Sequence, residues 1–134
     1  MKLGTLVVYV ENAIDEGNWF KKLGQRVDEK SAEYVVVDLG DGLELEMHSA
    51  SSESDTEFVD EANRLPRFSG IYLYLRTSDI DSDFDKLQAL SPHDAVVKRP
   101  WGNREFLLES PSGLKVMVYT LPAGRTERAE YDWH

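Results

Sequence analysis

Residues 101–119 have the sequence WGNREFLLESPSGLKVMVY, and this stretch decides how the fold ends. Arg104 to Glu109 and Leu114 to Thr120 are short runs rich in apolar, aromatic and β-branched residues, which is typical of strands. The sequence PSG at 111–113 between them is a turn sequence. The stretch therefore predicts two strands joined by a tight turn as the last elements of the folded chain.

The residues before these two strands predict three more elements in a fixed order. Gly70 to Thr77 places Ile71, Leu73 and Leu75 on one face and is expected to be a strand. Asp79 to Leu90 is expected to be a helix, and Ala95 to Lys98 a further strand. Residues 68–120 therefore predict the order β-α-β-β-β.

The first half of the chain predicts the same order. Leu3 to Val10 is expected to be a strand, and Asn12 and Gly24 are suited to start and end a helix of about three turns. Three strands are expected next, at Gln25 to Val27, Glu33 to Leu39 and Leu43 to His48. An order of five elements that occurs twice is strong evidence, because a coincidence would have to occur twice.

The length of 134 residues fits one domain with its own core. We predict a single α+β domain over residues 1–121. It consists of repeat one at 3–49, a polar and acidic connector at 50–67, and repeat two at 68–120. A charged tail without periodicity follows at 122–134.

Composition and charge exclude several classes of partner. The 25 acidic and 15 basic residues give a net charge of −10, which repels nucleic acid and anionic membrane surfaces. The chain has no cysteine, so disulfides and thiolate zinc sites are excluded. The apolar run near the N-terminus is too short for a secretory signal, and no run approaches the ~18 apolar residues of a membrane span. A cytoplasmic location is expected.

Three stretches carry a family resemblance: residues 6–24 (LVVYVENAIDEGNWFKKLG), residues 70–84 (GIYLYLRTSDIDSDF) and residues 101–119. Together they resemble the vicinal-oxygen-chelate superfamily, which includes glyoxalases and bleomycin-resistance proteins. The last stretch resembles the Trp-Gly, Arg-x-Phe and Asp-Pro-x-Gly pattern of small members, with Ser110 in place of the usual Asp. The resemblance implies two βαβββ repeats that form a concave mixed-sheet groove, and it implies a homodimer.

In this superfamily, metal-dependent members place one ligand on the first strand and one on the last strand of each repeat. The matching positions here are Thr5 and Glu46 in repeat one, and Tyr72 and Met117 in repeat two. They lie 67 and 71 residues apart between repeats (72 minus 5, 117 minus 46). Only Glu46 is a competent ligand, because neutral Thr and Tyr bind divalent ions poorly and Met prefers soft ions. We therefore expect no cofactor; a divalent metal at Glu46 is the alternative.

Strand alternation predicts the lining of the concave face independently of the resemblance. The predicted ligand-binding residues are Thr5, Val7, Tyr9, Glu46, His48, Tyr72, Tyr74 and Met117, together with Trp101 in a loop shaped by Pro100 and Gly102. Aromatic side chains, a thioether and a few polar groups suit a small organic molecule. Exposed or half-buried sheet residues without a ligand are the alternative for these strand positions, and a plug or dimer contact is the alternative for Trp101.

Glu46 and His48 are the best candidates for chemistry or charge recognition. They share one face of a strand about 7 Å apart, close enough to bind one ligand or exchange a proton through water.

Three functions are compatible with these residues. The first is a metal-free protein that binds a small aromatic or cationic molecule, as bleomycin-resistance proteins do. The second is a metal-dependent lyase, isomerase or transferase of the glyoxalase type. The third is a regulatory or structural homodimer with a vestigial groove. We predict the first function.

Overall fold

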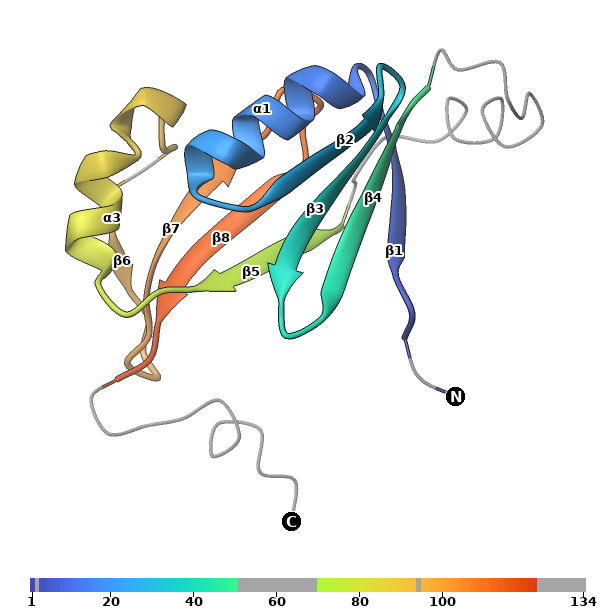
Figure 1. Cartoon of the computed structure of the whole chain (residues 1–134). Helices are drawn as coiled ribbons and strands as arrows, with labels where there is room; N and C mark the ends of the chain where they lie inside the picture. The colour runs from blue at the N-terminus through green and yellow to red at the C-terminus, as the bar shows by residue number, and fades with distance from the viewer. Residues whose placement is uncertain (2, 51–69, 94, 123–134) are drawn as a thin grey trace. The chain divides into compact units, whose positions relative to one another are not determined.

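The computed structural model describes residues 1, 3–50, 70–93 and 95–122, and it contains the βαβββ order twice (Figure 1). The first repeat consists of β1 (Leu6–Val10), α1 (Ala13–Leu23), β2 (Val27–Ser31), β3 (Tyr34–Gly40) and β4 (Leu43–Ser49). The second consists of β5 (Tyr72–Arg76), α3 (Ile80–Lys86), the 3₁₀ turn Gln88–Leu90, β6 (Val97–Lys98), β7 (Arg104–Glu109) and β8 (Lys115–Thr120). The predicted α+β fold of two βαβββ repeats is confirmed.

Each repeat forms its own four-stranded mixed sheet. The strand order is β1-β4-β3-β2 in the first sheet and β5-β8-β7-β6 in the second. The first strand runs parallel to the last one in both, and the other pairs are antiparallel. Val7 pairs with Glu46, and Tyr74 pairs with Met117. These partners have the same offsets of 67 and 71 residues between repeats (74 minus 7, 117 minus 46) that the sequence comparison gave.

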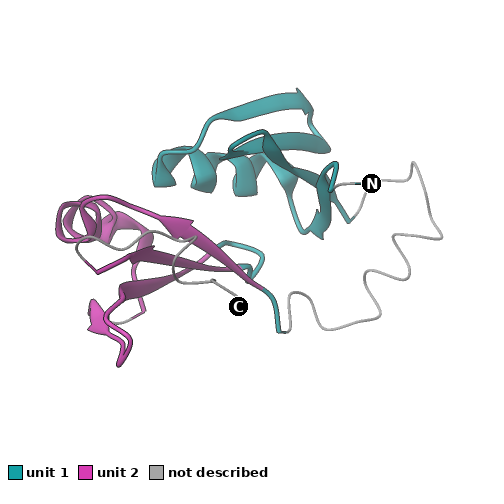
Figure 2. Cartoon of the chain, turned by 90° about the horizontal axis from the view of Figure 1, so that it is seen from below, with its two compact units in different colours: residues 1–71, 110–114 teal, residues 72–109, 115–134 magenta. Residues whose placement is uncertain are grey.

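The chain divides into two compact units (Figure 2). The first unit contains residues 1–71 and 110–114, and the second contains residues 72–109 and 115–134. The division follows the two repeats except for the turn at 110–114, which lies with the first unit. Of the predicted connector and tail, only Ala50 and Pro122 are among the described residues.

Helix α1 begins and ends as its sequence predicts. The Asn12 side chain accepts a hydrogen bond from the amide of Asp15 at 3.0 Å. Gly24 ends the helix in the left-handed conformation with φ +107°, and its amide bonds to the carbonyl of Lys21. A residue with a Cβ is strained at that φ, so glycine is the natural stop.

Helix α1 runs across one face of the first sheet and seals the core of the first unit (Figure 1). The core side chains alternate along β3 and β4 and include Val35, Val37, Leu45 and Met47, all at most 1% exposed. Phe20 of α1 is fully buried against this layer. The other face of the sheet is free of α1, and it carries the candidate site described below.

Two elements differ from the sequence prediction. The strand predicted at Gln25 to Val27 was wrong in its position, because β2 is Val27–Ser31. Its sequence VDEKS is polar and exposed, and it becomes a strand only because its backbone pairs with β3 at the edge of the sheet. The helix predicted to reach Leu90 ends at Lys86 and continues as a 3₁₀ turn.

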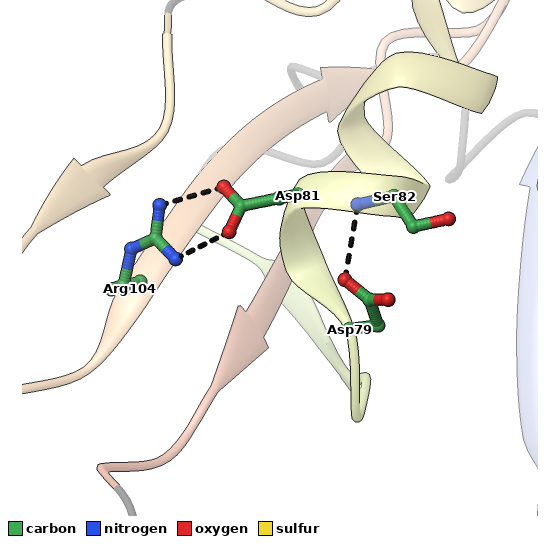
Figure 3. A network of polar contacts seen from close by, with 4 residues as sticks. All are labelled: Asp79, Asp81, Ser82 and Arg104. Carbon is green, nitrogen blue, oxygen red and sulfur yellow. Dashed lines mark hydrogen bonds and ion pairs between the residues drawn. The ribbon is translucent and has the colours of Figure 1, made fainter.

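Helix α3 makes two kinds of polar contact, one that caps its start and one that joins it to the second sheet (Figure 3). The Asp79 side chain caps the helix by accepting a hydrogen bond from the Ser82 amide at 3.1 Å. Asp81 forms a bidentate ion pair with Arg104 of β7: Nη1 and Nη2 of Arg104 donate to Oδ2 and Oδ1 of Asp81 at 2.9 and 2.7 Å. Because Asp81 is largely exposed, solvent screens this pair and its contribution to stability is small.

A buried carboxylate ties α1 to the turn at 110–114 within the first unit. Glu16 is fully buried, and one of its oxygens accepts a hydrogen bond from the Ser112 amide at 2.5 Å. Its other oxygen has no hydrogen-bond partner in the described residues. The amide of Glu11 in turn donates to the Ser112 hydroxyl at 3.0 Å. Burial, opposed by these serine contacts and assisted by the charge of Glu11, raises the pKa of Glu16.

Glycine is required at position 17, where α1 lies closest to the sheet. A Cβ there would lie 2.9 Å from Cγ1 of Val35 and 3.2 Å from Cγ1 of Val27. We expect Gly17→Ala to destabilise the protein by about 1–2 kcal/mol in urea unfolding, because overpacking against stiff valines outweighs the higher helix propensity of alanine. Gly4→Ala is the control, since a Cβ at Gly4 meets no atom within 4 Å. Equal stability of both variants would contradict this account of the packing.

The raised pKa of Glu16 predicts a pH-dependent stability. The folded state binds the Glu16 proton more tightly than the unfolded state, so this residue contributes stability at low pH that is lost as pH rises through the folded-state pKa. Glu16→Gln should therefore unfold at higher urea than the parent at pH 7.5, by roughly 1 kcal/mol, and the gain should vanish near pH 4. Glu33→Gln, which removes an exposed charge, serves as the control. A gain independent of pH would rule out titration of Glu16.

Candidate functional site

Three aromatic rings form a row across the first sheet, on the face opposite to α1. Tyr9 of β1 pairs with His48 of β4, and His48 pairs on its other side with Tyr34 of β3. The rings of His48 and Tyr34 are stacked, with centroids 4.5 Å apart and an angle of 16°. The Tyr9 ring lies 5.9 Å from His48 at 38°. We call Tyr9, His48 and Tyr34 the tyrosine–histidine row.

Glu46 places a carboxylate directly beside this row. It lies two residues before His48 on the same face, and its Oε2 is 3.6 Å from Nε2 of His48. Loss of hydration, together with the charge of Glu46 and its hydrogen-bonding influence, raises the pKa of Tyr34. The side chains of Glu46 and His48 are both 29% exposed, so a ligand can reach them.

A pocket of about 420 Å³ lies on the first sheet and its β3–β4 turn. Its lining residues are Arg26, Val27, Asp28, Val36, Asp38, Asp41, Gly42 and Glu44. Val36, which pairs with Glu46 on one side and Asp28 on the other, connects the pocket to Glu46. We call this cavity the acidic pocket.

The predicted residues of the first repeat come together in part. Val7 pairs with Glu46 and is 51% exposed, and Tyr9, Glu46 and His48 are neighbours on one face. Thr5 precedes β1, and its hydroxyl donates to the carbonyl of Glu44 at 3.0 Å. The Thr5 side chain therefore holds the backbone of β4 at Glu44, which lines the pocket.

The predicted residues of the second repeat lie on the second sheet and its loops. Tyr72 and Tyr74 are 46% and 56% exposed, and Met117 is buried beside Tyr74. The Tyr74 ring makes an edge contact with Tyr119 at 5.7 Å. Trp101 is 56% exposed in the loop before β7. Tyr72 and Tyr74 therefore lie exposed on β5, and Trp101 lies exposed in a separate loop.

The sequence analysis missed Tyr34 and the acidic pocket. Tyr34 was inside a predicted strand, but its partner was not considered. In the structure Gly40 pairs with Leu43, and counting back from that pair would oppose Tyr34 to Ser49; a register shift between Asp38 and Gly40 brings Tyr34 opposite His48 instead. The sequence carries no signal for that shift. The pocket depends in addition on β2, whose position was predicted wrongly.

The four positions that would hold a metal in the superfamily do not fit one here. Thr5 donates its hydroxyl proton to a backbone carbonyl, and Glu46 is the one competent carboxylate among the four positions. Tyr72 and Met117 are poor ligands for hard divalent ions. Within residues 1, 3–50, 70–93 and 95–122, no group of three or more His, Cys, Asp or Glu side chains is arranged to hold a metal.

Within the described part of the chain, no helix is both long and apolar enough to cross a bilayer.

Comparison with known proteins identifies the fold. No family model and no curated protein matches the sequence. Among solved structures, a glyoxalase/bleomycin resistance protein/dioxygenase from Nocardioides is similar, with a TM-score of 0.70 and 15% identity over 95% of this chain and 87% of that one. A lactoylglutathione lyase from Agrobacterium tumefaciens gives 0.62 and 14% over 89% and 92%. An integron cassette protein from Vibrio cholerae gives 0.68 and 19% over 90% and 94%.

These likenesses confirm the resemblance seen in the sequence at the level of fold. The chain has the vicinal-oxygen-chelate fold of glyoxalase-type proteins. A shared fold at such low identity does not transfer an activity.

Proposed function

We propose that this chain is a glyoxalase/bleomycin-resistance-like protein that works without a metal and binds a small, planar, positively charged organic molecule. The binding surface is the tyrosine–histidine row with Glu46. The observation that carries the proposal is the stacked His48–Tyr34 pair with a partly exposed carboxylate beside it. A planar ring stacks on such a row, and its positive charge pairs with the carboxylate.

The electrostatics of the site favour a cation. The Oε2 of Glu46 lies 3.6 Å from Nε2 of His48, and its negative charge acts on Tyr34, so a carboxylate stands directly beside the two stacked rings. The net charge of −10 favours the approach of cations over anions. Cation–π contact at a partly exposed site contributes about 1 kcal/mol, and a charge-assisted hydrogen bond about 1.5–3 kcal/mol.

The exposed aromatic residues of the second unit are compatible with the same class of ligand. Tyr72, Tyr74 and Trp101 are 46%, 56% and 56% exposed. The homodimer and the cytoplasmic location stay predictions.

The proposal predicts that the protein binds a planar monocation such as proflavine with a Kd on the order of 10 µM at low salt, measured by calorimetry. Glu46→Gln should weaken binding about five- to tenfold, because it removes the charge while keeping the shape. Tyr34→Ala should weaken it by a similar factor through lost stacking.

Glu29→Gln is the matched control. It removes the same charge from the same sheet, but Glu29 pairs with Lys21 of α1 on the opposite face. It should leave the Kd within twofold of the parent. If Glu29→Gln weakens binding as much as Glu46→Gln, the protein attracts cations only through its net charge and the proposed site is wrong. A stoichiometric divalent metal lost in Glu46→Gln would favour the metal-dependent alternative.

A further inference from the structure

We infer that the ligand carries a second positive charge, an amine on a flexible chain, and that this amine enters the acidic pocket beside the tyrosine–histidine row. The inference rests on the proposed function and specifies the chemical class of its ligand. It is carried by the position, size and charge of the pocket within the first unit.

The pocket and the row belong to one continuous face of the first sheet. Side chains alternate along β4, so Glu44, Glu46 and His48 point to the same side. Glu44 lines the pocket, His48 belongs to the row, and Glu46 lies between them. Val36 makes the same connection across the strands, because it lines the pocket and pairs with Glu46. A ligand stacked on the row therefore has the pocket within reach of a short side chain.

The pocket is large enough for such a chain. Its volume of about 420 Å³ is many times the ~30 Å³ that one water molecule occupies in the liquid. Val36 supplies apolar surface for methylene groups on this face, and the carboxylates of Asp28, Asp38 and Glu44 lie on the same and neighbouring strands. An aminoalkyl chain has this combination of apolar stem and charged end.

The charges in the pocket favour an amine over an acid. Four carboxylates (Asp28, Asp38, Asp41 and Glu44) and one guanidinium (Arg26) line it, which leaves a formal charge of −3 (four minus one). Asp28 is paired with Lys30 at 2.6 Å, and Asp38 accepts a hydrogen bond from the Gly40 amide. Within the described residues, the side chains of Asp41 and Glu44 make no ion pair. The charge of Lys30 also acts on Glu44, so a ligand amine there would compete with Lys30.

The strand geometry sets the distance between the two charges of the ligand. Glu44 lies two residues from Glu46 along β4, which is about 7 Å. Asp28 on β2 and Glu46 on β4 both pair with Val36 of β3, so they lie two strand spacings apart, which is about 10 Å. A planar cation paired with Glu46 would therefore bear its amine roughly 7–10 Å from the ring charge.

The test compares compounds that share one planar cationic ring. The ring alone, and the ring with a chain ending in an amine, a hydroxyl or a carboxylate, are titrated into the protein by calorimetry at low salt. The amine compound should bind about tenfold more tightly than the ring alone. The hydroxyl compound should gain at most about twofold, and the carboxylate compound should gain nothing, since it meets an excess of acids.

The double variant Asp41→Asn/Glu44→Gln locates the extra affinity. The quantity measured is the ratio of the Kd of the ring alone to that of the amine compound, which should fall from about ten to about two. Glu29→Gln, on the opposite face, should keep the ratio near ten. Circular dichroism confirms that each variant is folded.

The outcomes separate the two proposals. If the ring binds and the amine adds nothing, or if the carboxylate compound binds best, the inference is wrong while the proposed function stands. If the amine gains tenfold but the double variant keeps that gain, the amine lies elsewhere and the inference is also wrong. If none of the four compounds binds, the proposed function fails and the inference fails with it.

Discussion

Strand β4 lies between β1 and β3, and its alternating side chains build two parts of the first unit at once. Leu45 and Met47 point toward α1 and form the core, whereas Glu46 and His48 point to the opposite face. A shift of the register by one residue would exchange these two sets and bury the charges. The aromatic row depends on the same register, because Tyr9 and Tyr34 meet only where both pair with His48. Core packing therefore holds the candidate site in place.

The two repeats share a topology but differ in the chemistry of this face. With the offset of 71 residues, Glu46 corresponds to Met117 and His48 corresponds to Tyr119. The second repeat thus has a thioether and a phenol where the first has a carboxylate and an imidazole. Both residues of the second repeat are buried at 7% exposure. At these positions a carboxylate is present only in the first repeat, so the proposed cation is placed there.

Local sequence signals predicted the elements whose formation depends on local chemistry. Asn12 and Gly24 marked the ends of α1, and β-branched runs marked β1, β3 and β8. Position 27–31 has no such signal, because its polar residues form a strand only through pairing with β3. The role of Glu16 was equally hidden, since its partner Ser112 lies 96 residues away. Strand alternation predicted Glu46 and His48 on one face, but the stacking of Tyr34 required knowledge of the β3–β4 register.

The central claim is that the face of the first sheet opposite to α1 binds a planar cation. Amide chemical shifts of ¹⁵N-labelled protein, recorded while proflavine is added, test it most directly because they report on each strand separately. The account predicts saturable shifts concentrated at Tyr9, Tyr34 and His48 and at their strand neighbours. Shifts confined to β5 and β8, or spread without saturation over all acidic surfaces, would contradict it.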